Sequence, residues 1–201
     1  MLITHLKAED ELRACVFGKV LVISCEGCKE VYFPEVEMLD KIGDGWVKIR
    51  TDSICNLENQ QLKKHADRVK SADTILVLAC GAGVQTVASF FDDKRVVAAC
   101  DTYPLHGWQG VTPLEYSCGQ CGECFLNDTG GICPITSCSK GLINGQCGGV
   151  KDGNCEVDKD MVCGWERIYK QLERLGQLDT LTRSVKIRDF ARELESGNEN
   201  N

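Results

Sequence analysis

Eight of the chain's 14 cysteines lie within residues 118–163, and this density constrains the fold more than any other feature. The same stretch is rich in glycine and has no sustained helical or strand periodicity. Such a segment cannot bury enough apolar surface to fold by itself, and metal ligation commonly replaces the missing core. We therefore expect residues 104–164 to form an irregular, metal-binding Cys-rich segment.

Before this segment, short apolar runs alternate with helical stripes. The runs at residues 19–24, 46–50, 74–79 and 95–99 are rich in Val and Ile, which is typical of strands buried on both faces. The alternation predicts a small doubly wound, flavodoxin-like α/β domain with a parallel sheet over residues 1–103. Its expected helices carry apolar residues at helical spacing: Val36, Leu39 and Ile42; Leu62, Ala66 and Val69; Val84, Val87, Ala88 and Phe91.

Residues 165–201 return to helical patterning. An apolar stripe begins at Trp165, continues through Ile168 and Leu172, and stops at Gly176, which is a typical residue after a helix end. A second stripe at Ile187, Phe190, Ala191 and Leu194 predicts another helix before a polar tail. We therefore expect amphipathic C-terminal helices after the Cys-rich segment.

Several of the N-terminal cysteines follow the predicted strands. Cys25 and Cys28 follow the first strand, Cys55 lies beyond the second, and Cys80 and Cys100 end the third and fourth. Because the carboxyl ends of parallel strands share one edge, these thiols should converge there. We predict a metal site built from Cys25, Cys28, Cys55 and Cys80, with Cys100 as an alternative to Cys55 or Cys80. The other interpretation is that strand-end cysteines are small buried apolar residues.

The cysteines of residues 118–163 form a second group. Its opening, CGQCGEC, matches the first three ligands of the bacterial ferredoxin run, and a Cys-Pro pair follows after eight residues instead of three. Eight thiolates can serve two four-ligand sites, so we expect two or three [4Fe–4S] clusters in the whole chain. Zinc at one site and disulfides are the alternatives, because spacing alone does not separate the metals. The predicted ligands here are Cys118, Cys121, Cys124, Cys133, Cys138, Cys147, Cys155 and Cys163.

The charge of the chain excludes other functions. Twenty-three basic against 30 acidic residues give a formal net charge of −7, the wrong sign for a phosphate-binding surface, so nucleic acid is not an expected partner. The N-terminus has no apolar signal region, and no stretch approaches 18 uncharged apolar residues, so membrane insertion is not expected. We expect a cytoplasmic protein, in which thiols stay reduced and available for metal.

Several motifs resemble one family. The runs TGGICP from Thr129, CSKGLINGQCGG from Cys138 and CGWERIYKQL from Cys163, with LACGAGVQTVA from Leu78, are similar to the methylenetetrahydrofolate reductase C-terminal domain family. The resemblance covers about residues 19–175. Family members often carry a third cysteine in the first loop, near Tyr32 here, and a proline where this chain has Gln146.

The resemblance implies an iron–sulfur small subunit of the one-carbon, Wood–Ljungdahl metabolism of anaerobes. Its partner would be a flavin-containing TIM-barrel subunit that reduces methylene- to methyltetrahydrofolate, and ferredoxin or another subunit would donate the electrons. The chain itself offers no flavin, folate or acid–base constellation, which favours a non-catalytic electron relay. The alternatives are a zinc-stabilised docking subunit and a redox protein that uses the Cys25–Cys28 dithiol.

Overall fold

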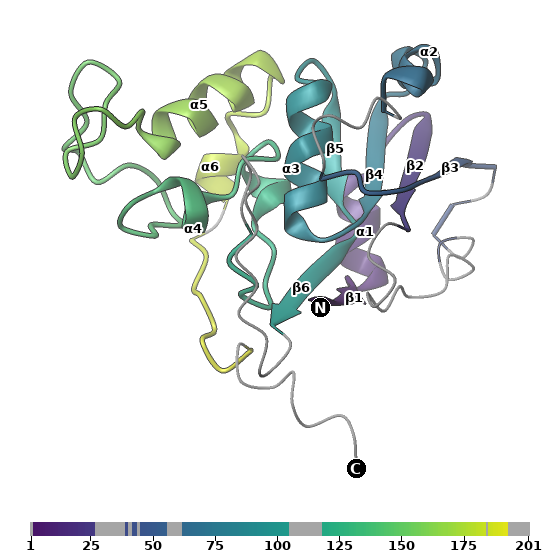
Figure 1. Ribbon diagram of the computed structural model, residues 1–201, viewed down its shortest axis with the longest axis horizontal. Coiled ribbons are helices and arrows are strands. Elements are labelled where there is room, and N and C mark those ends of the chain that lie inside the picture. The colour runs from purple at the N-terminus through teal and green to yellow at the C-terminus, as the bar shows by residue number, and fades with distance from the viewer. Residues whose placement is uncertain are drawn as a thin grey trace.

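The computed structural model describes residues 2–26, 39, 42–43, 45–55, 62–104, 118–183 and 185–192. Four parallel strands form its central sheet in the order β3-β2-β4-β5 (Figure 1). Each begins and ends within one residue of a predicted apolar run, so the mixed α/β class and the parallel sheet are confirmed. The strands are β2 (Val20–Cys25), β3 (Val47–Thr51), β4 (Thr74–Leu78) and β5 (Arg95–Ala98).

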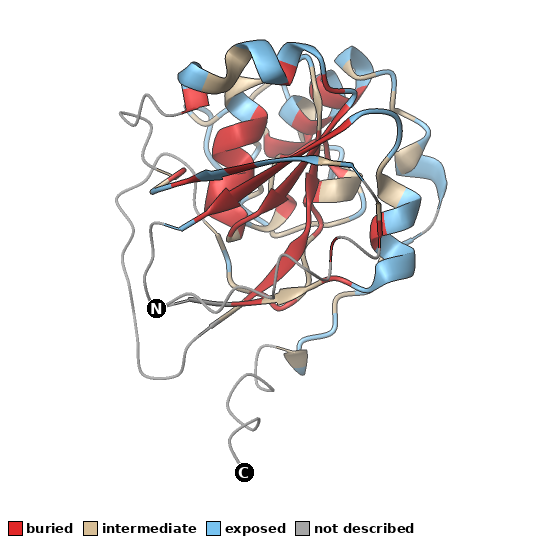
Figure 2. Cartoon of the chain, turned by 90° about the vertical axis from the view of Figure 1, so that its right-hand side faces the viewer, coloured by how far each residue is buried: buried red, intermediate tan, exposed pale blue. Residues whose placement is uncertain are grey.

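Both faces of this sheet are covered, because successive side chains of a strand point to opposite faces. On one face, Ile23, Ile75 and Val77 pack with α3 (Gly81–Phe90) and α2 (Ala66–Lys70), which follows a 3₁₀ turn, η2 (Leu62–His65). On the other face, Val22 and Leu76 pack with α1 (Glu9–Cys15). Figure 2 shows the buried residues concentrated in the strands and α3.

The predicted helices around residues 62–69 and 84–91 are confirmed by η2, α2 and α3. The helix expected at Val36, Leu39 and Ile42 lies mostly outside the described residues, although Leu39 and Ile42 are themselves buried against the sheet. The short helix α1 was not predicted.

A second, unpredicted sheet pairs the two ends of the α/β part. Strand β1 (Leu2–Leu6) runs antiparallel to β6 (Cys100–Pro104), with Leu6 opposite Cys100. Lys7 follows β1 directly, and its backbone N–H donates to the carbonyl of Ala99 at 2.9 Å. The pairing therefore places the start of the chain beside the residues that lead into the Cys-rich segment.

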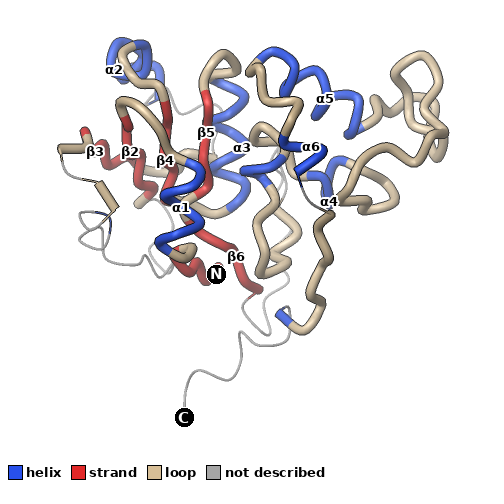
Figure 3. Tube along the Cα trace, turned by 180° about the vertical axis from the view of Figure 1, so that it is seen from behind, coloured by secondary structure: helices blue, strands red, loops and turns tan. Residues whose placement is uncertain are grey.

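The Cys-rich segment is mostly loop (Figure 3), with short elements η3 (Leu126–Asp128) and α4 (Pro134–Ser137). It is attached to the outer edge of β5 by Asn127. The Asn127 side chain accepts a 2.6 Å hydrogen bond from the backbone N–H of Ala98 and donates a 3.2 Å bond to the carbonyl of the same residue. Leu126 joins the apolar cluster of the sheet, so the two parts share one core.

The helix predicted from Trp165 is confirmed as α5 (Gly164–Arg174). Its buried face packs on the Cys-rich segment through Trp165, Ile168 and Leu172. The helix ends at Arg174, and Gly176, two residues further on, has a φ of +65°. The N–H of Gln177 donates to the carbonyl of Leu172 at 2.8 Å, and the N–H of Gly176 donates to the carbonyl of Glu173. These two hydrogen bonds form a Schellman motif. A four-residue helix, α6 (Thr180–Arg183), follows.

The second C-terminal helix does not form over the described start of its stripe, although Arg192, the last residue described there, is helical. Residues 185–189 form no regular structure, and the side chain of Ile187 is 84% exposed instead of facing a core. The physical reason lies in Asn144, whose side chain donates to the carbonyl of Lys186 and accepts from its N–H, both at 2.8 Å. These bonds satisfy both backbone groups of Lys186 without a helix. Leu194, the last member of the stripe, lies outside the described residues.

Candidate metal centres

Four cysteines surround a pocket beneath the N-terminus of α3. Cys118, Cys121, Cys124 and Cys133 line it, and the remaining wall includes Gly81, Thr102 and Leu126. The CGQCGEC loop supplies three of these thiols, and the residue before α4 supplies the fourth. The structure therefore gathers the predicted ferredoxin-like run and its Cys-Pro partner around one space, which we name the inner cysteine set.

Burial governs the ionisation of the inner cysteine set. It raises the pKa of Cys118 to about 11 and that of Cys124 well above the ordinary thiol value. Backbone hydrogen bonds at Gln120 and Leu126 oppose this rise, because each favours the thiolate of Cys118 or Cys124. Without metal these two thiols hold their protons at neutral pH, and metal binding would have to release them.

The other four cysteines of the segment line a second pocket. Cys138, Cys147, Cys155 and Cys163 lie there beside Trp165, at the N-terminus of α5. We name them the outer cysteine set, because their loops form the end of the molecule farthest from the sheet (Figure 1). A backbone hydrogen bond at Val157 and a hydrogen bond between the Cys155 sulfur and the Ser139 hydroxyl, 3.7 Å apart, lower the pKa of Cys155. This thiol is thus more ready to ionise than an ordinary cysteine.

Three of the four predicted strand-end ligands approach one another. Burial raises the pKa of Cys80 to about 12, and the nearby sulfurs of Cys118, Cys55 and Cys25 add to the rise. Cys28 lies outside the described residues. Cys100 begins β6 and packs in the apolar cluster on the opposite sheet face.

Gly81 allows the inner set to approach Cys80. A Cβ atom on Gly81 would stand 2.8 Å from the sulfur of Cys118, closer than real side chains permit. The missing side chain therefore lets Cys118 lie directly against the N-terminus of α3, next to Cys80. Cys118 connects the strand-end cysteines with the inner set.

The donor chemistry fits thiolate-bound metal, whereas the side-chain geometry is that of free thiols. Every cysteine that the structure describes is free, so none of them forms a disulfide. Within the described ranges, no three Cys, His, Asp or Glu side chains are arranged to hold a metal ion. The sulfur of Cys121, for example, lies 3.0 Å from the carbonyl oxygen of Glu123. What fits is the donor set: two pockets, each lined by four cysteines.

The comparisons identify the family of this part of the chain. Residues 97–191 match the family model described as methylene-tetrahydrofolate reductase C terminal. The segment that contains both four-cysteine pockets is therefore similar to the methylenetetrahydrofolate reductase C-terminal family, as its motifs indicated. No curated protein and no solved structure matches the chain. None of the helices described here is long and apolar enough to cross a membrane.

Two charged residues beside the inner set were not predicted. Asp101 accepts a 2.7 Å hydrogen bond from the backbone N–H of Cys124, and Lys7 forms an ion pair with Asp101. Lys7 and Asp101 are far apart in the sequence, and only the pairing of β1 with β6 brings them together. The one local signal is an aspartate shortly after the apolar run that forms β5.

Proposed function

We propose that this protein is an iron–sulfur electron-transfer subunit that supplies electrons to a flavin-containing methylenetetrahydrofolate reductase. The observation that carries the proposal is the division of eight cysteines into two four-cysteine pockets within the family segment. Four thiolates are the usual ligand number of a [4Fe–4S] cluster. The chain's own residues would hold these centres, and the carbon chemistry would belong to the partner's flavin and folate.

The inner cysteine set is the best candidate for a [4Fe–4S] cluster. Its first three ligands have ferredoxin spacing, and backbone hydrogen bonds at Gln120 and Leu126 point to sulfurs that ligation would leave charged. Such bonds to cluster sulfurs also set reduction potentials. We assign a second cluster to Cys25, Cys28, Cys55 and Cys80, of which three already approach one another.

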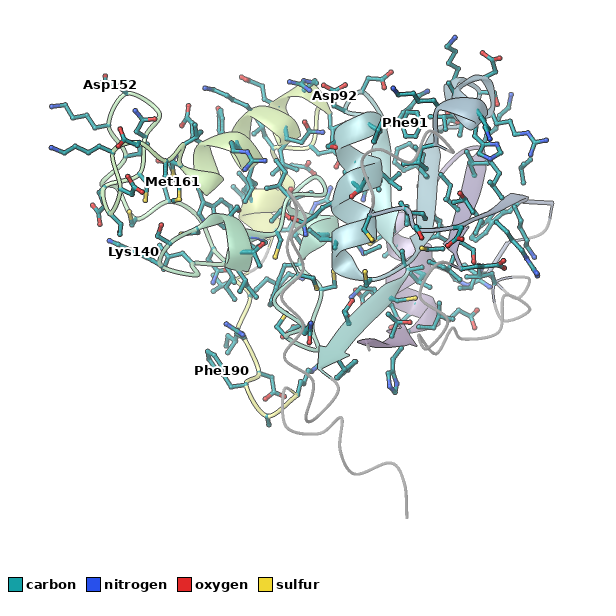
Figure 4. All side chains as sticks on the ribbon, viewed as in Figure 1. Phe91, Asp92, Lys140, Asp152, Met161 and Phe190 are labelled. Carbon is teal, nitrogen blue, oxygen red and sulfur yellow. The ribbon has the colours of Figure 1, made fainter. Side chains whose placement is uncertain are left out.

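The three candidate sites follow one another along the molecule. Cys118 lies beside Cys80, which links the strand-end site to the inner set. Helix α4 then joins Cys133 of the inner set to Cys138 of the outer set. The four residues of α4 advance about 6 Å, so the inner and outer sets are separated by a short path. Sulfur atoms lie below α3 and again in the loops that carry Met161 (Figure 4). The iron centres, when bound, would store and pass single electrons along this series.

A second candidate function rests on the outer set. None of its four cysteines is fully buried, Cys147 is exposed, and the pKa of Cys155 is lowered. A closed four-cysteine site of this kind also suits structural zinc. Zinc there, with no iron elsewhere, would make the chain a docking subunit of the same reductase. A Cys25–Cys28 dithiol is less favoured, because Cys25 is buried and reactive thiols need access.

Metal analysis of cysteine variants tests the proposal. Wild type, Cys118→Ala, Cys147→Ala and the control Cys15→Ala are purified without oxygen, and iron, sulfide and zinc are measured per chain. Cys15 is half-buried beside Arg95 and belongs to none of the three sites. We expect Cys118→Ala to lose about four iron atoms, Cys147→Ala to lose the outer metal, and Cys15→Ala to match wild type.

The electron-transfer role has its own readout. Dithionite-reduced wild type should reduce the flavin of a methylenetetrahydrofolate reductase, and Cys118→Ala should do so far more slowly. A colourless wild-type protein with stoichiometric zinc would reject the relay and support the docking subunit. Equal iron content in wild type and Cys118→Ala would show that the inner set is not a cluster site.

A further inference from the structure

Lys7 is a buried cation next to the inner cysteine set. Its side chain is only 3% exposed, although a lysine is rarely buried so completely. Its ammonium lies 2.8 Å from Oδ1 of Asp101 and 2.8 Å from Oε1 of Glu11, the residue one helical turn further along in α1. The side chain of Glu11 is 47% exposed, so water screens its charge, whereas Asp101 is largely shielded.

Asp101 connects this cation to a predicted ligand. The oxygen that accepts the ion pair from Lys7 also accepts the 2.7 Å hydrogen bond from the backbone N–H of Cys124. Cys124 is itself shielded from water. Of the charged groups that act on its sulfur, Lys7 favours the thiolate more strongly than Asp101 or Cys118 opposes it. Lys7 is therefore the largest single charge that acts on the sulfur of Cys124, and it favours the thiolate.

A buried cation has a specific consequence at a cluster. When a four-thiolate iron–sulfur centre takes up one electron, it gains one negative charge and no proton. A positive charge held nearby in a water-poor setting lowers the free energy of this reduced form. Lys7 is held by two carboxylates and by its own backbone hydrogen bond to Ala99, so its ammonium group stays in this position.

We propose that Lys7 sets the reduction potential of the inner cluster, with Asp101 as the positioning residue that holds Cys124 and Lys7 in one arrangement. The inference rests on the proposed function, because it requires a cluster at Cys118, Cys121, Cys124 and Cys133. The pairing of β1 with β6 then has a redox role, since it delivers the cation to a ligand more than a hundred residues further along the chain.

Two substitutions around Lys7 should move the potential in opposite directions. Lys7→Met removes the cation and keeps the length of the side chain, so the midpoint potential should fall. Glu11→Gln removes a negative charge that lies beside the Lys7 ammonium, so the midpoint potential should rise. This rise should be smaller than the fall for Lys7→Met, because the Glu11 side chain is half exposed. The potential is measured by redox titration monitored by electron paramagnetic resonance. Lys7→Arg should stay close to wild type, and so should Lys70→Met, which removes a 78% exposed lysine.

Lys7→Met and Glu11→Gln together distinguish an effect of Lys7 on the reduction potential from a purely structural role. If Lys7 only stabilised the fold, both variants would lower the melting temperature and their potentials would stay together. Equal potentials in wild type, Lys7→Met and Glu11→Gln would overturn the inference and leave the proposed function intact. A wild-type protein without a redox-active centre would instead overturn the proposed function.

A second pair covers the case in which Lys7→Met fails to fold, because loss of Lys7 leaves Asp101 buried without its cation. Asp101→Asn keeps an oxygen that accepts the N–H of Cys124, and the double variant Lys7→Met with Asp101→Asn leaves no unpaired carboxylate. The double variant should have a lower midpoint potential than Asp101→Asn alone. Identical potentials in these two proteins would contradict a role for the Lys7 charge.

Discussion

The sheet and the Cys-rich segment are stabilised in different ways. Every residue of β2 and β4 is buried, and apolar clusters cover both faces of the sheet. In contrast, no residue from 135 to 163, a stretch that the structure describes throughout, is buried. The first region gains its free energy from apolar surface removed from water. The second contains cysteines where a core would otherwise be, which is the composition of a segment that folds around metal.

The largest expected effect comes from metal removal. In the metal-free chain, residues 135–163 should lose protection against amide hydrogen exchange, because little apolar burial remains to hold them. Strands β2 and β4 should keep theirs. Exchange measured by mass spectrometry on the loaded and the chelated protein checks this difference. Equal protection of residues 135–163 in both forms would show that the segment is held by its hydrogen bonds and by α5 instead.

Substitutions in the sheet and in the Cys-rich segment should differ in their effect on the free energy of unfolding, although this difference is smaller than the effect of metal removal. Ile75→Ala removes a fully buried side chain from β4 and should lower the free energy of unfolding by about 2–5 kcal/mol. Val157→Ala shortens an exposed side chain in the outer loops and should change it by less than about 0.5 kcal/mol. Urea unfolding of both variants provides the measurement. A loss at Val157 as large as that at Ile75 would mean that the loops contain a core of their own.

The smallest effect concerns pH. Burial raises the pKa of Cys100 from 9.0 to about 12, so the folded chain keeps a proton that the unfolded chain releases. The retained proton contributes to the free energy of unfolding. This contribution is fully present below pH 9 and is lost as the pH rises from 9 to 12, with about 1 kcal/mol already lost at pH 10. Urea unfolding of metal-free protein at pH 8 and pH 10 should show a smaller decline for Cys100→Ala than for wild type.

Cys155→Ala is the matched variant from the Cys-rich segment. Backbone hydrogen bonds lower the pKa of Cys155, so its removal should not reduce the decline between pH 8 and pH 10. If Cys100→Ala and wild type declined equally, the Cys100 thiol would not be protected from ionisation by the sheet.

The parallel strands could be predicted because their signal is local. The run of β4 is apolar from Ile75 to Leu78, which suits burial on both faces. The pairing of β1 with β6 depends on residues about a hundred positions apart, and β6 contains Asp101 and Pro104, which are uncommon in strands. The stripe at Ile187 and Phe190 has helical spacing, but both side chains are exposed, and Asn144 binds the backbone of the preceding Lys186.

The candidate metal sites could likewise be predicted only in part from the sequence. Spacing indicated that the eight clustered cysteines could form two groups of four, and the structure shows which four line each pocket. Spacing could not indicate that Gly81 makes room for Cys118, because that contact joins α3 to a loop far along the chain. Nor could it indicate Lys7, whose significance depends on a long-range strand pair.

The hydrogen bonds of Asn127 to Ala98 have a consequence for biogenesis. β5 is an edge strand, and the outer N–H and C=O of Ala98 are occupied by this one side chain. An uncovered edge is a template for pairing with other chains. A newly made polypeptide whose Cys-rich segment has not yet settled would leave that edge open. Iron or zinc starvation during expression should therefore favour aggregation, with β5 as the contact between chains.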